Sequence, residues 1–192
     1  MKDKIRLFVD MDGTLAEFKA VDTLEKLYEE NYFLNLKPHK NVVDAVSYIC
    51  KFYPDIEVYI LSAVLSDSPY ALDEKNKWLD MYLPEIDDSH RIFPPCGTDK
   101  KEFLESAFGC ISDKDFLLDD YSNNLHSWDP PARGIKLLNG INGNHGTWKK
   151  EKVSIECNAT DLAENLVHII VNNTINYSKA ETCFNTIKRK SR

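Results

Sequence analysis

The sequence predicts an α/β fold built on a doubly wound parallel sheet with helices on both of its faces. Short apolar runs typical of buried strands alternate along the chain with amphipathic stretches that have helical spacing. Two of these runs end close to paired acids, which is where open parallel sheets carry functional side chains. The 192 residues are enough for a sizeable core, so we expect one domain over residues 1–175.

The N-terminal part of the chain begins this alternation. Residues 5–9 form the first expected strand. Residues 17–30 have apolar positions near helical spacing, and the aromatic segment 31–36 ends that pattern. A clear amphipathic helix follows Pro38, and residues 57–61 form the second expected strand, which reads as buried on both faces.

The middle of the chain contains two further helices on either side of a short strand. Ser68 is expected as the N-cap, and Pro69 as the first residue, of a helix that stops near Pro84. Residues 91–93 are a short strand candidate. Thr98 then has the position of an N-cap before the next helix.

The C-terminal part repeats the pattern and then loses it. We expect three more strands, at residues 115–118, 134–138 and 153–155, and a final helix capped by Thr160. From about Asn173 polar and basic residues replace the apolar stripe, so residues 176–192 are expected to be a frayed tail. The glycine-rich loop 139–148, with His145, suits either close approach to a ligand or a long hairpin turn.

Composition and charge restrict the partners. A net charge of −7 argues against a nucleic-acid polymer or an anionic membrane surface as a partner. No apolar run approaches membrane-spanning length, and no signal-peptide-like run opens the chain. The five cysteines are scattered and lack a CxxC spacing, which predicts neither a zinc site nor a disulfide framework. We therefore expect a cytoplasmic protein, and a homodimer is left open.

Two acids directly after the first strand are the strongest chemical signal. Asp10 and Asp12 are two residues apart, so on a continuing strand both side chains address one small volume. Two carboxylates that close repel each other unless a cation or a shared proton lies between them. The pair therefore suits Mg²⁺ binding together with acid–base chemistry. The competing interpretation is a surface turn in which both acids are merely solvated.

Other polar residues occur where the same sheet edge is expected. Ser62 follows the second strand, Asp119 and Asp120 follow the strand at 115–118, and Lys100 lies in the first turn of a helix. Acids for a hard cation, with a hydroxyl and a lysine for phosphate oxygens, are typical of phosphoryl transfer.

Several of these assignments have rivals in the sequence itself. Ser62 also suits a turn or helix cap, and Lys101 competes with Lys100. Asp119 and Asp120 cannot be ranked as metal ligands, because adjacent residues at a strand end face differently. Two neighbouring asparagines, Asn123 and Asn124, are candidates for orienting one of these acids, although asparagine is also a common turn former.

Residues 10–14 (DMDGT) resemble the first motif of the haloacid dehalogenase-like (HAD) superfamily of phosphohydrolases, and residues 15–18 (LAEF) resemble its 5'(3')-deoxyribonucleotidase branch. Leu61-Ser62, Lys100 and Leu118-Asp119-Asp120 match the other three motifs, so the resemblance covers most of residues 5–170. It implies a Rossmann-like, HAD-like sheet with a small helical cap inserted at about residues 18–36.

The resemblance also implies a role for each residue. Asp10 would be the nucleophile that forms an aspartyl-phosphate, and Asp12 the general acid and base. Mg²⁺ would be held by Asp10, by the backbone carbonyl of Asp12, and by Asp119 and Asp120. The phosphate would be bound by Thr14, Ser62 and Lys100, and the substrate base would be contacted by Phe18.

The residues predict Mg²⁺-dependent phosphoryl transfer, and the resemblance implies a phosphomonoester hydrolase, a 5'-nucleotidase-like enzyme acting on (deoxy)ribonucleoside monophosphates. A halide leaving group needs no proton donor, whereas an alkoxide does, so Asp12 favours phosphate esters over dehalogenation. Thr14 replaces the valine of well-known deoxyribonucleotidases, which also allows a general phosphatase of small molecules such as sugar phosphates. A phospho-aspartate signalling module is disfavoured, because its acid pair, acceptor aspartate and lysine follow a different order.

Overall fold

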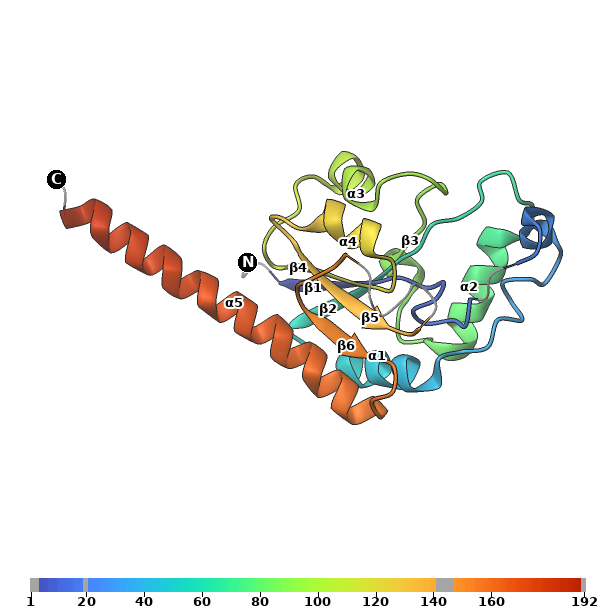
Figure 1. The fold of residues 1–192 in the computed structure, drawn as a ribbon, viewed down its shortest axis with the longest axis horizontal. Helices are drawn as coiled ribbons and strands as arrows, with labels where there is room; N and C mark the ends of the chain where they lie inside the picture. Colours follow the sequence, from blue (N-terminus) through green and yellow to red (C-terminus); the bar gives the residue numbers. More distant parts are fainter. Residues whose placement is uncertain (1–3, 19–20, 141–146, 191–192) are drawn as a thin grey trace.

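A six-stranded sheet forms the centre of the molecule. The computed structural model describes residues 4–18, 21–140 and 147–190, and from residue 175 onward only the backbone path (Figure 1). The strands are β1 (Ile5–Val9), β2 (Ile56–Leu61), β3 (Arg91–Ile92), β4 (Asp115–Asp119), β5 (Arg133–Leu138) and β6 (Lys152–Ser154). They lie in the order β3-β2-β1-β4-β5-β6, and every neighbouring pair is parallel. The predicted α/β class is therefore confirmed.

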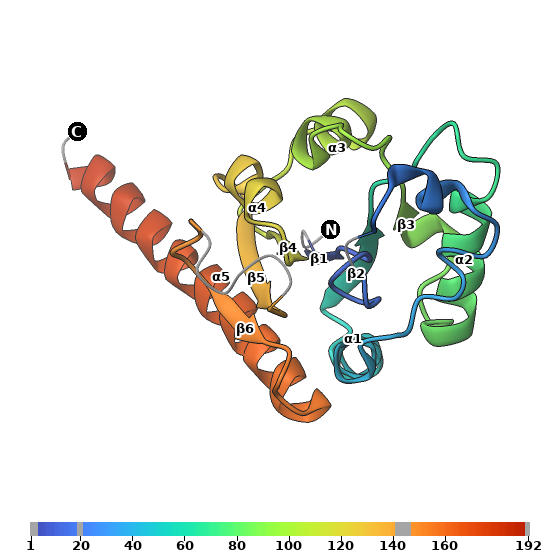
Figure 2. The same cartoon turned by 45° about the vertical axis from the view of Figure 1, so that its right-hand side comes forward.

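Helices cover both faces of this sheet. They are α1 (Lys40–Phe52), α2 (Ala71–Tyr82), α3 (Lys100–Phe108), α4 (Ser122–Trp128) and α5 (Ala159–Lys190), with short 3-10 helices η1 (Leu24–Tyr28) and η2 (Asp88–His90). Helices α1 and α5 lie on one side of the sheet, and α3 and α4 lie on the other (Figure 2). This arrangement is the one expected when strands and amphipathic helices alternate along the chain.

Side chains along β1 alternate between two hydrophobic cores, one on each face of the sheet. Leu7 and Val9 are fully buried in the core that contains α1, α2 and α5. Phe8 points to the opposite core, which contains α3 and α4. Its ring packs edge-on against Trp128 of α4, with 5.3 Å between the ring centroids. Because both faces are covered, every residue of this strand except Arg6 is apolar.

The strand order changes direction between β1 and β4. From β1 the chain first builds β2 and β3 on one side, and then returns to add β4, β5 and β6 on the other side. In open α/β sheets the crevice at such a switch point, outside the carboxyl ends of the strands, is the usual ligand site. Asp10 directly follows β1, and Asp120 directly follows β4.

The helix expected at residues 17–30 is wrong. In the described part of this segment only η1 is helical, and the exposed fraction of its Leu24 is 71%. The turn that follows, residues 31–34, is stabilised by α2. The Glu74 carboxylate of that helix accepts hydrogen bonds from the backbone N–H groups of Asn31, Phe33 and Leu34. These contacts with a segment about forty residues away decide the local conformation, and helical spacing alone does not reveal them.

Two expected helix starts in the middle of the chain are also shifted. Helix α2 begins at Ala71, while the hydroxyl of Ser68 accepts hydrogen bonds from the N–H groups of Tyr70 and Ala71. Asp99, and not Thr98, is the N-cap of α3, since its carboxylate accepts from the N–H of Glu102 at 3.0 Å.

The C-terminal elements differ in a similar way. Helix α5 begins before Thr160, and the side-chain oxygen of Asn158 accepts from the N–H of Asp161. Where a frayed tail was expected, the backbone stays helical to Lys190 and extends beyond the sheet (Figure 1). Helix α4 was not predicted. The greater part of the 139–148 loop, residues 141–146 with His145, lies outside the described residues. Within the described chain, no helix has the length and apolarity needed to cross a bilayer.

Candidate active site

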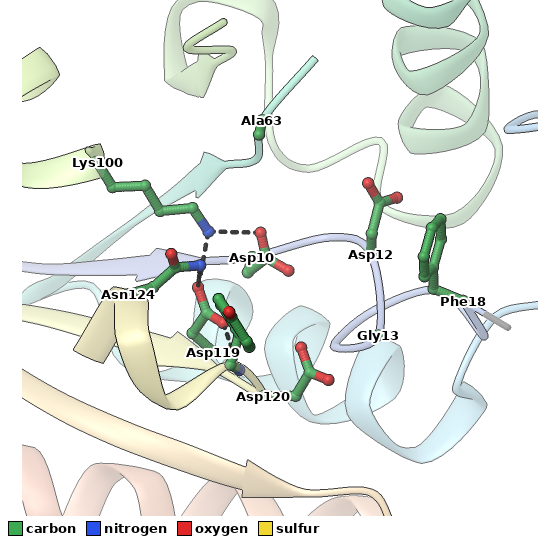
Figure 3. A pocket seen from close by; sticks show the side chains of 10 residues that line it. Asp10, Asp12, Gly13, Phe18, Ala63, Lys100, Asp119, Asp120 and Asn124 are labelled. Atoms are coloured by element: carbon green, nitrogen blue, oxygen red, sulfur yellow. Dashed lines mark hydrogen bonds and ion pairs between the residues drawn. The ribbon is translucent and has the colours of Figure 1, made fainter. Parts of the chain in front are cut away.

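A cavity of about 400 Å³ opens at the carboxyl ends of β1 and β4 (Figure 3). It lies at the switch point of the sheet, where the fold predicts a ligand site. Six of the residues singled out from the sequence motifs line it, together with Asn124 and three others. The lining residues are Asp10, Asp12, Gly13, Phe18, Ala63, Lys100, Asp119, Asp120, Tyr121 and Asn124.

Three buried carboxylates meet on one side of this cavity. Asp10, Asp119 and Asp120 each offer one oxygen, and these oxygens all lie within 4.8 Å of one another. All three residues are at least nine-tenths buried, so their mutual repulsion is only weakly screened by water. A cluster of carboxylate oxygens of this size matches the ligand preference of a hard divalent cation such as Mg²⁺. The residues present therefore fit the metal that the sequence predicts.

One ammonium group faces these acids. Lys100 is the first residue of α3, and its Nζ donates to Asp10 Oδ1 at 2.5 Å and to Asp119 Oδ2 at 2.7 Å (Figure 3). The competing Lys101 points elsewhere, since its Nζ donates to the backbone carbonyl of Pro130 at 2.7 Å. Of the two lysines, Lys100, the one favoured from the sequence, is therefore the one that lines the cavity.

Burial and like charges control the protonation of this cluster. Burial is the largest influence on Asp10, and with the neighbouring charges of Asp119 and Asp12 it raises the pKa of the carboxyl to about 8, against the lowering effect of Lys100. Burial alone would lower the pKa of Lys100, but Asp10 and Asp119 outweigh it and raise the pKa, so the ammonium stays charged. A divalent cation at this position would favour the ionised form of Asp10.

The acids after β4 are held by their own loop and by α4. Asp119 Oδ1 accepts a hydrogen bond from the backbone N–H of Tyr121 at 2.7 Å, and its Oδ2 accepts one from Asn124 Nδ2 at 2.8 Å. Asn123 instead donates to the hydroxyl of Tyr121. Of the two asparagines that the sequence offered, Asn124 is therefore the one that orients an acid of the cluster.

Asn139, directly after β5, contacts an acid of the site, although sequence reasoning named only its loop, residues 139–148, and gave Asn139 itself no role. Its Nδ2 donates to Asp120 Oδ2 at 2.9 Å and to the carbonyl oxygen of Gly13 at 2.6 Å. It therefore ties the loop after β1 to the acid after β4. The signal that could have revealed it is its position, because it is the first polar residue after an expected strand whose neighbours end at the same edge.

Asp12 lines the cavity but stands apart from the three clustered acids (Figure 3). Its Oδ2 accepts a hydrogen bond from Lys75 Nζ on α2 at 2.6 Å. Lys75 is fully buried and was also missed. A signal for it exists in the sequence, since it interrupts a buried stripe formed by Ala71 and Leu79 at i and i+8.

The remaining predicted residues have different positions. Phe18 lines the cavity and packs edge-on against Tyr32, with 6.4 Å between the ring centroids. Ser62 is fully buried, and its hydroxyl accepts from Lys75 at 3.0 Å. Thr14 is fully buried as well, and its hydroxyl has no hydrogen-bond partner within the described part of the chain. The structure thus brings Phe18 to the cavity wall, whereas Ser62 and Thr14 are not among the residues that line the cavity.

Comparison with known proteins identifies the fold. No protein-family model matches the chain, and no curated protein sequence matches it. The solved structure of 3-deoxy-D-manno-octulosonate 8-phosphate phosphatase from Moraxella catarrhalis, in complex with a magnesium ion, a phosphate ion and KDO, is similar, with a TM-score of 0.50 and 12% identity. The similarity covers 94% of this chain and 93% of that chain.

A hypothetical protein from Xanthomonas campestris is similar to the same degree. Its TM-score is 0.50 and its identity 14%, over 94% of this chain and 88% of that chain. At such identities the similarity shows a common fold and does not identify a substrate. The chain therefore has a HAD-like α/β fold, as the sequence predicted.

Proposed function

We propose that the protein is a Mg²⁺-dependent phosphomonoester hydrolase of the HAD superfamily. One observation carries this proposal: Asp10, Asp119, Asp120 and Lys100, from three distant segments, converge at one cavity whose wall also contains Asp12. A cation site, an ammonium group and a separate acid are together what phosphoryl transfer to water requires.

Each residue has a defined part in the proposed reaction. Mg²⁺ would be held by Asp10, by Asp119 and Asp120, and by the backbone carbonyl of Asp12, and when bound it supplies positive charge for the transferring phosphoryl group. A carboxylate oxygen of Asp10 attacks phosphorus, and the bond from phosphorus to the ester oxygen breaks. Asp12 gives its proton to that leaving oxygen. It then takes a proton from the water that hydrolyses the aspartyl-phosphate and releases phosphate.

Lys100 is the phosphate ligand that the geometry supports best. Within the described chain its ammonium group donates to two carboxylates, which leaves a third N–H for a phosphate oxygen. Ser62 and Thr14 stay proposed members of the phosphate site from the resemblance, and neither lines the cavity. A cap formed by residues 18–36, a cytoplasmic location and a homodimer also remain predictions.

The substrate we propose is a nucleoside monophosphate. Phe18 forms part of the cavity wall, and Tyr121, whose exposed fraction is 47%, provides a second aromatic ring there. Aromatic rings on a wall are suited to stacking against a nucleobase. A sugar phosphate is the second candidate, since the phosphatase of the same fold from Moraxella catarrhalis was solved with KDO.

A substrate panel with Mg²⁺ or EDTA tests the proposal. We expect phosphate release from deoxyribonucleoside monophosphates with Mg²⁺, and none with EDTA. Asp10→Asn should abolish release, whereas Asp44→Asn, at an exposed acid paired with Lys40, should not change it. Equal, weak release from sugar phosphates and nucleotides would favour the general phosphatase. Phosphate release that is independent of divalent cations would contradict the proposal.

A further inference from the structure

The buried lysine of α2 makes a complete set of hydrogen bonds. Lys75 Nζ donates to Asp12 Oδ2 at 2.6 Å, to Ser62 Oγ at 3.0 Å and to the carbonyl oxygen of Ala63 at 2.7 Å. An ammonium group has three N–H donors, so each of them has an acceptor here. The side chain has no exposed surface, and a buried cation is tolerated only when it is paired and bonded in this way.

This arrangement separates Lys75 from the phosphate site. Lys75 is absent from the cavity lining, whereas Lys100 is part of it. A phosphate oxygen could bond to Lys75 only if one of its three hydrogen bonds were broken. The two lysines near the acids therefore have different tasks: Lys100 faces the cavity, and Lys75 supports its wall.

We infer that Lys75 is a positioning residue for Asp12, an inference that rests on the proposed function. Lys75 fixes Oδ2, whereas Asp12 Oδ1 is buried and has no hydrogen-bond partner within the described chain. Oδ1 is therefore the oxygen that carries the proton to the leaving group and later accepts one from water.

The surroundings of Lys75 hold it in this position. Ser62 and Ala63 lie at the end of β2 and anchor the ammonium from one side. The ring of Phe33 lies on another side, with 4.9 Å between Nζ and the ring centroid. Glu74, the preceding residue, binds the backbone of the 31–34 turn that carries Phe33. Helix α2 thus fixes Asp12 and the neighbouring turn through adjacent side chains.

The test compares two substrates that differ in how much they need an acid. Phenyl phosphate has a basic leaving group, whereas the 4-nitrophenoxide of 4-nitrophenyl phosphate leaves with little protonation. Lys75→Met should lower kcat for phenyl phosphate about 100-fold, because the oriented acid is lost. For 4-nitrophenyl phosphate we expect a loss of less than about 10-fold, and KM should stay nearly constant for both.

Controls separate positioning from folding. Lys77→Met removes an exposed lysine of the same helix, which pairs with Asp73, and should change neither rate. Lys75→Arg keeps a cation in the buried site, whereas Met removes it, so Lys75→Arg should show a smaller loss with the same substrate dependence. Adding Lys75→Met to Asp12→Asn should cost little further activity, because both act on one step.

The outcomes distinguish the two proposals. If folded Lys75→Met and Lys75→Arg lose activity equally on both substrates, or if KM rises instead, the positioning role is overturned while the hydrolase stands. If the wild-type protein releases phosphate neither from these two substrates nor from any compound of the nucleotide and sugar-phosphate panel, the proposed function fails as well. The denaturation midpoints of the same variants test the contact without any activity, since a real contact makes the two substitutions non-additive.

Discussion

The glycine after the two acids of the first loop decides how closely that loop can approach the acid after β4. Gly13 has a φ of +85°, and a Cβ at this position would lie 2.7 Å from Asp120 Oδ2. The same Asp120 oxygen accepts a hydrogen bond from Asn139, which also binds the Gly13 carbonyl. A side chain here would therefore displace a carboxylate of the proposed cation site.

We predict that Gly13→Ala weakens Mg²⁺ binding. Disturbing groups that orient metal ligands commonly costs about 10–100-fold in affinity, so the Mg²⁺ concentration for half-maximal activity should rise by about that factor. Gly97→Ala is the matched control, because Gly97 has a φ of +86° and nothing within 4 Å of its Cβ position. Both variants should lose about 1–2 kcal/mol of stability through backbone strain. An equal Mg²⁺ requirement in the two variants would contradict this account.

Residues that face the cavity from strand ends and helix starts could be predicted from the sequence. Asp10, Asp119 and Lys100 belong to short motifs, and the sheet-edge rule brings such motifs together. Lys75 and Asn139 could not be assigned a role, because their partners lie 63 and 126 residues away in the chain. Sequence spacing carries no information on such contacts unless the packing of the helix or strand is known.

At the scale of elements, α2 is the support of the segment between β1 and α1. The Glu74 carboxylate accepts hydrogen bonds from three backbone N–H groups of residues 31–34. The indole N–H of Trp78 donates to the Leu36 carbonyl oxygen at 2.8 Å. Asn31 has a φ of +66°, a conformation that asparagine tolerates better than most residues. This turn is therefore determined by α2 and by its own backbone.

We predict that Glu74→Gln loosens this turn. An amide presents one oxygen and a competing NH₂ group, so at least one N–H loses a charged acceptor, at a cost of about 1–3 kcal/mol. Hydrogen exchange should accelerate at the amides of Asn31, Phe33 and Leu34, while amides of β1 keep their protection. Asp73→Asn, at the exposed neighbouring position, should leave exchange unchanged. Unchanged protection of the turn in Glu74→Gln would show that other contacts hold it.

Elements with a strong apolar period were the predictable ones. Helix α1 and strand β2 were expected because their buried residues follow the periods of a helix and of a doubly covered strand. Residues 17–30 show a helical period, but their described part, 17–18 and 21–30, lacks the burial that would stabilise a helix. Helix α4 has only seven residues, so its two large buried side chains, Leu125 and Trp128, are too few to reveal a period.

At the scale of the whole molecule, the buried acids should make stability depend on pH and on divalent cations. The pKa of Asp10 is raised from 3.8 to about 8, mainly by burial. In the metal-free fold Asp10 thus retains a proton that the unfolded chain releases. Its contribution to stability is fully present below its unfolded pKa and is lost as pH rises through about 8.

We therefore predict that the Tm measured in EDTA falls as the pH rises from about 5 to about 8, and that Mg²⁺ raises Tm more at the upper end of this range. Asp10→Asn should remove this component of the slope, so the difference between variant and wild type isolates it. A wild-type Tm that rises relative to Asp10→Asn over the same range would show that Asp10 is not buried beside excess negative charge.

The parallel α/β sheet could be predicted from the sequence, whereas the full length of α5 could not. Alternating strands and helices imply parallel pairing, and parallel pairing brings the strand ends to one edge. The continuation of α5 to Lys190 was not expected, because polar and basic residues there lack the stripe that predicts a packed helix.

Asp10 is the residue proposed to receive the phosphoryl group, and trapping the phosphorylated carboxyl group tests this role. The wild-type protein would be mixed with Mg²⁺ and a phosphomonoester that it hydrolyses, and the reaction would be quenched in acid. Borohydride would then be added, because it reduces an aspartyl-phosphate to homoserine. We predict homoserine at position 10 by mass spectrometry, absent when substrate or Mg²⁺ is left out. Continued turnover with homoserine at another position, or at none, would contradict the account.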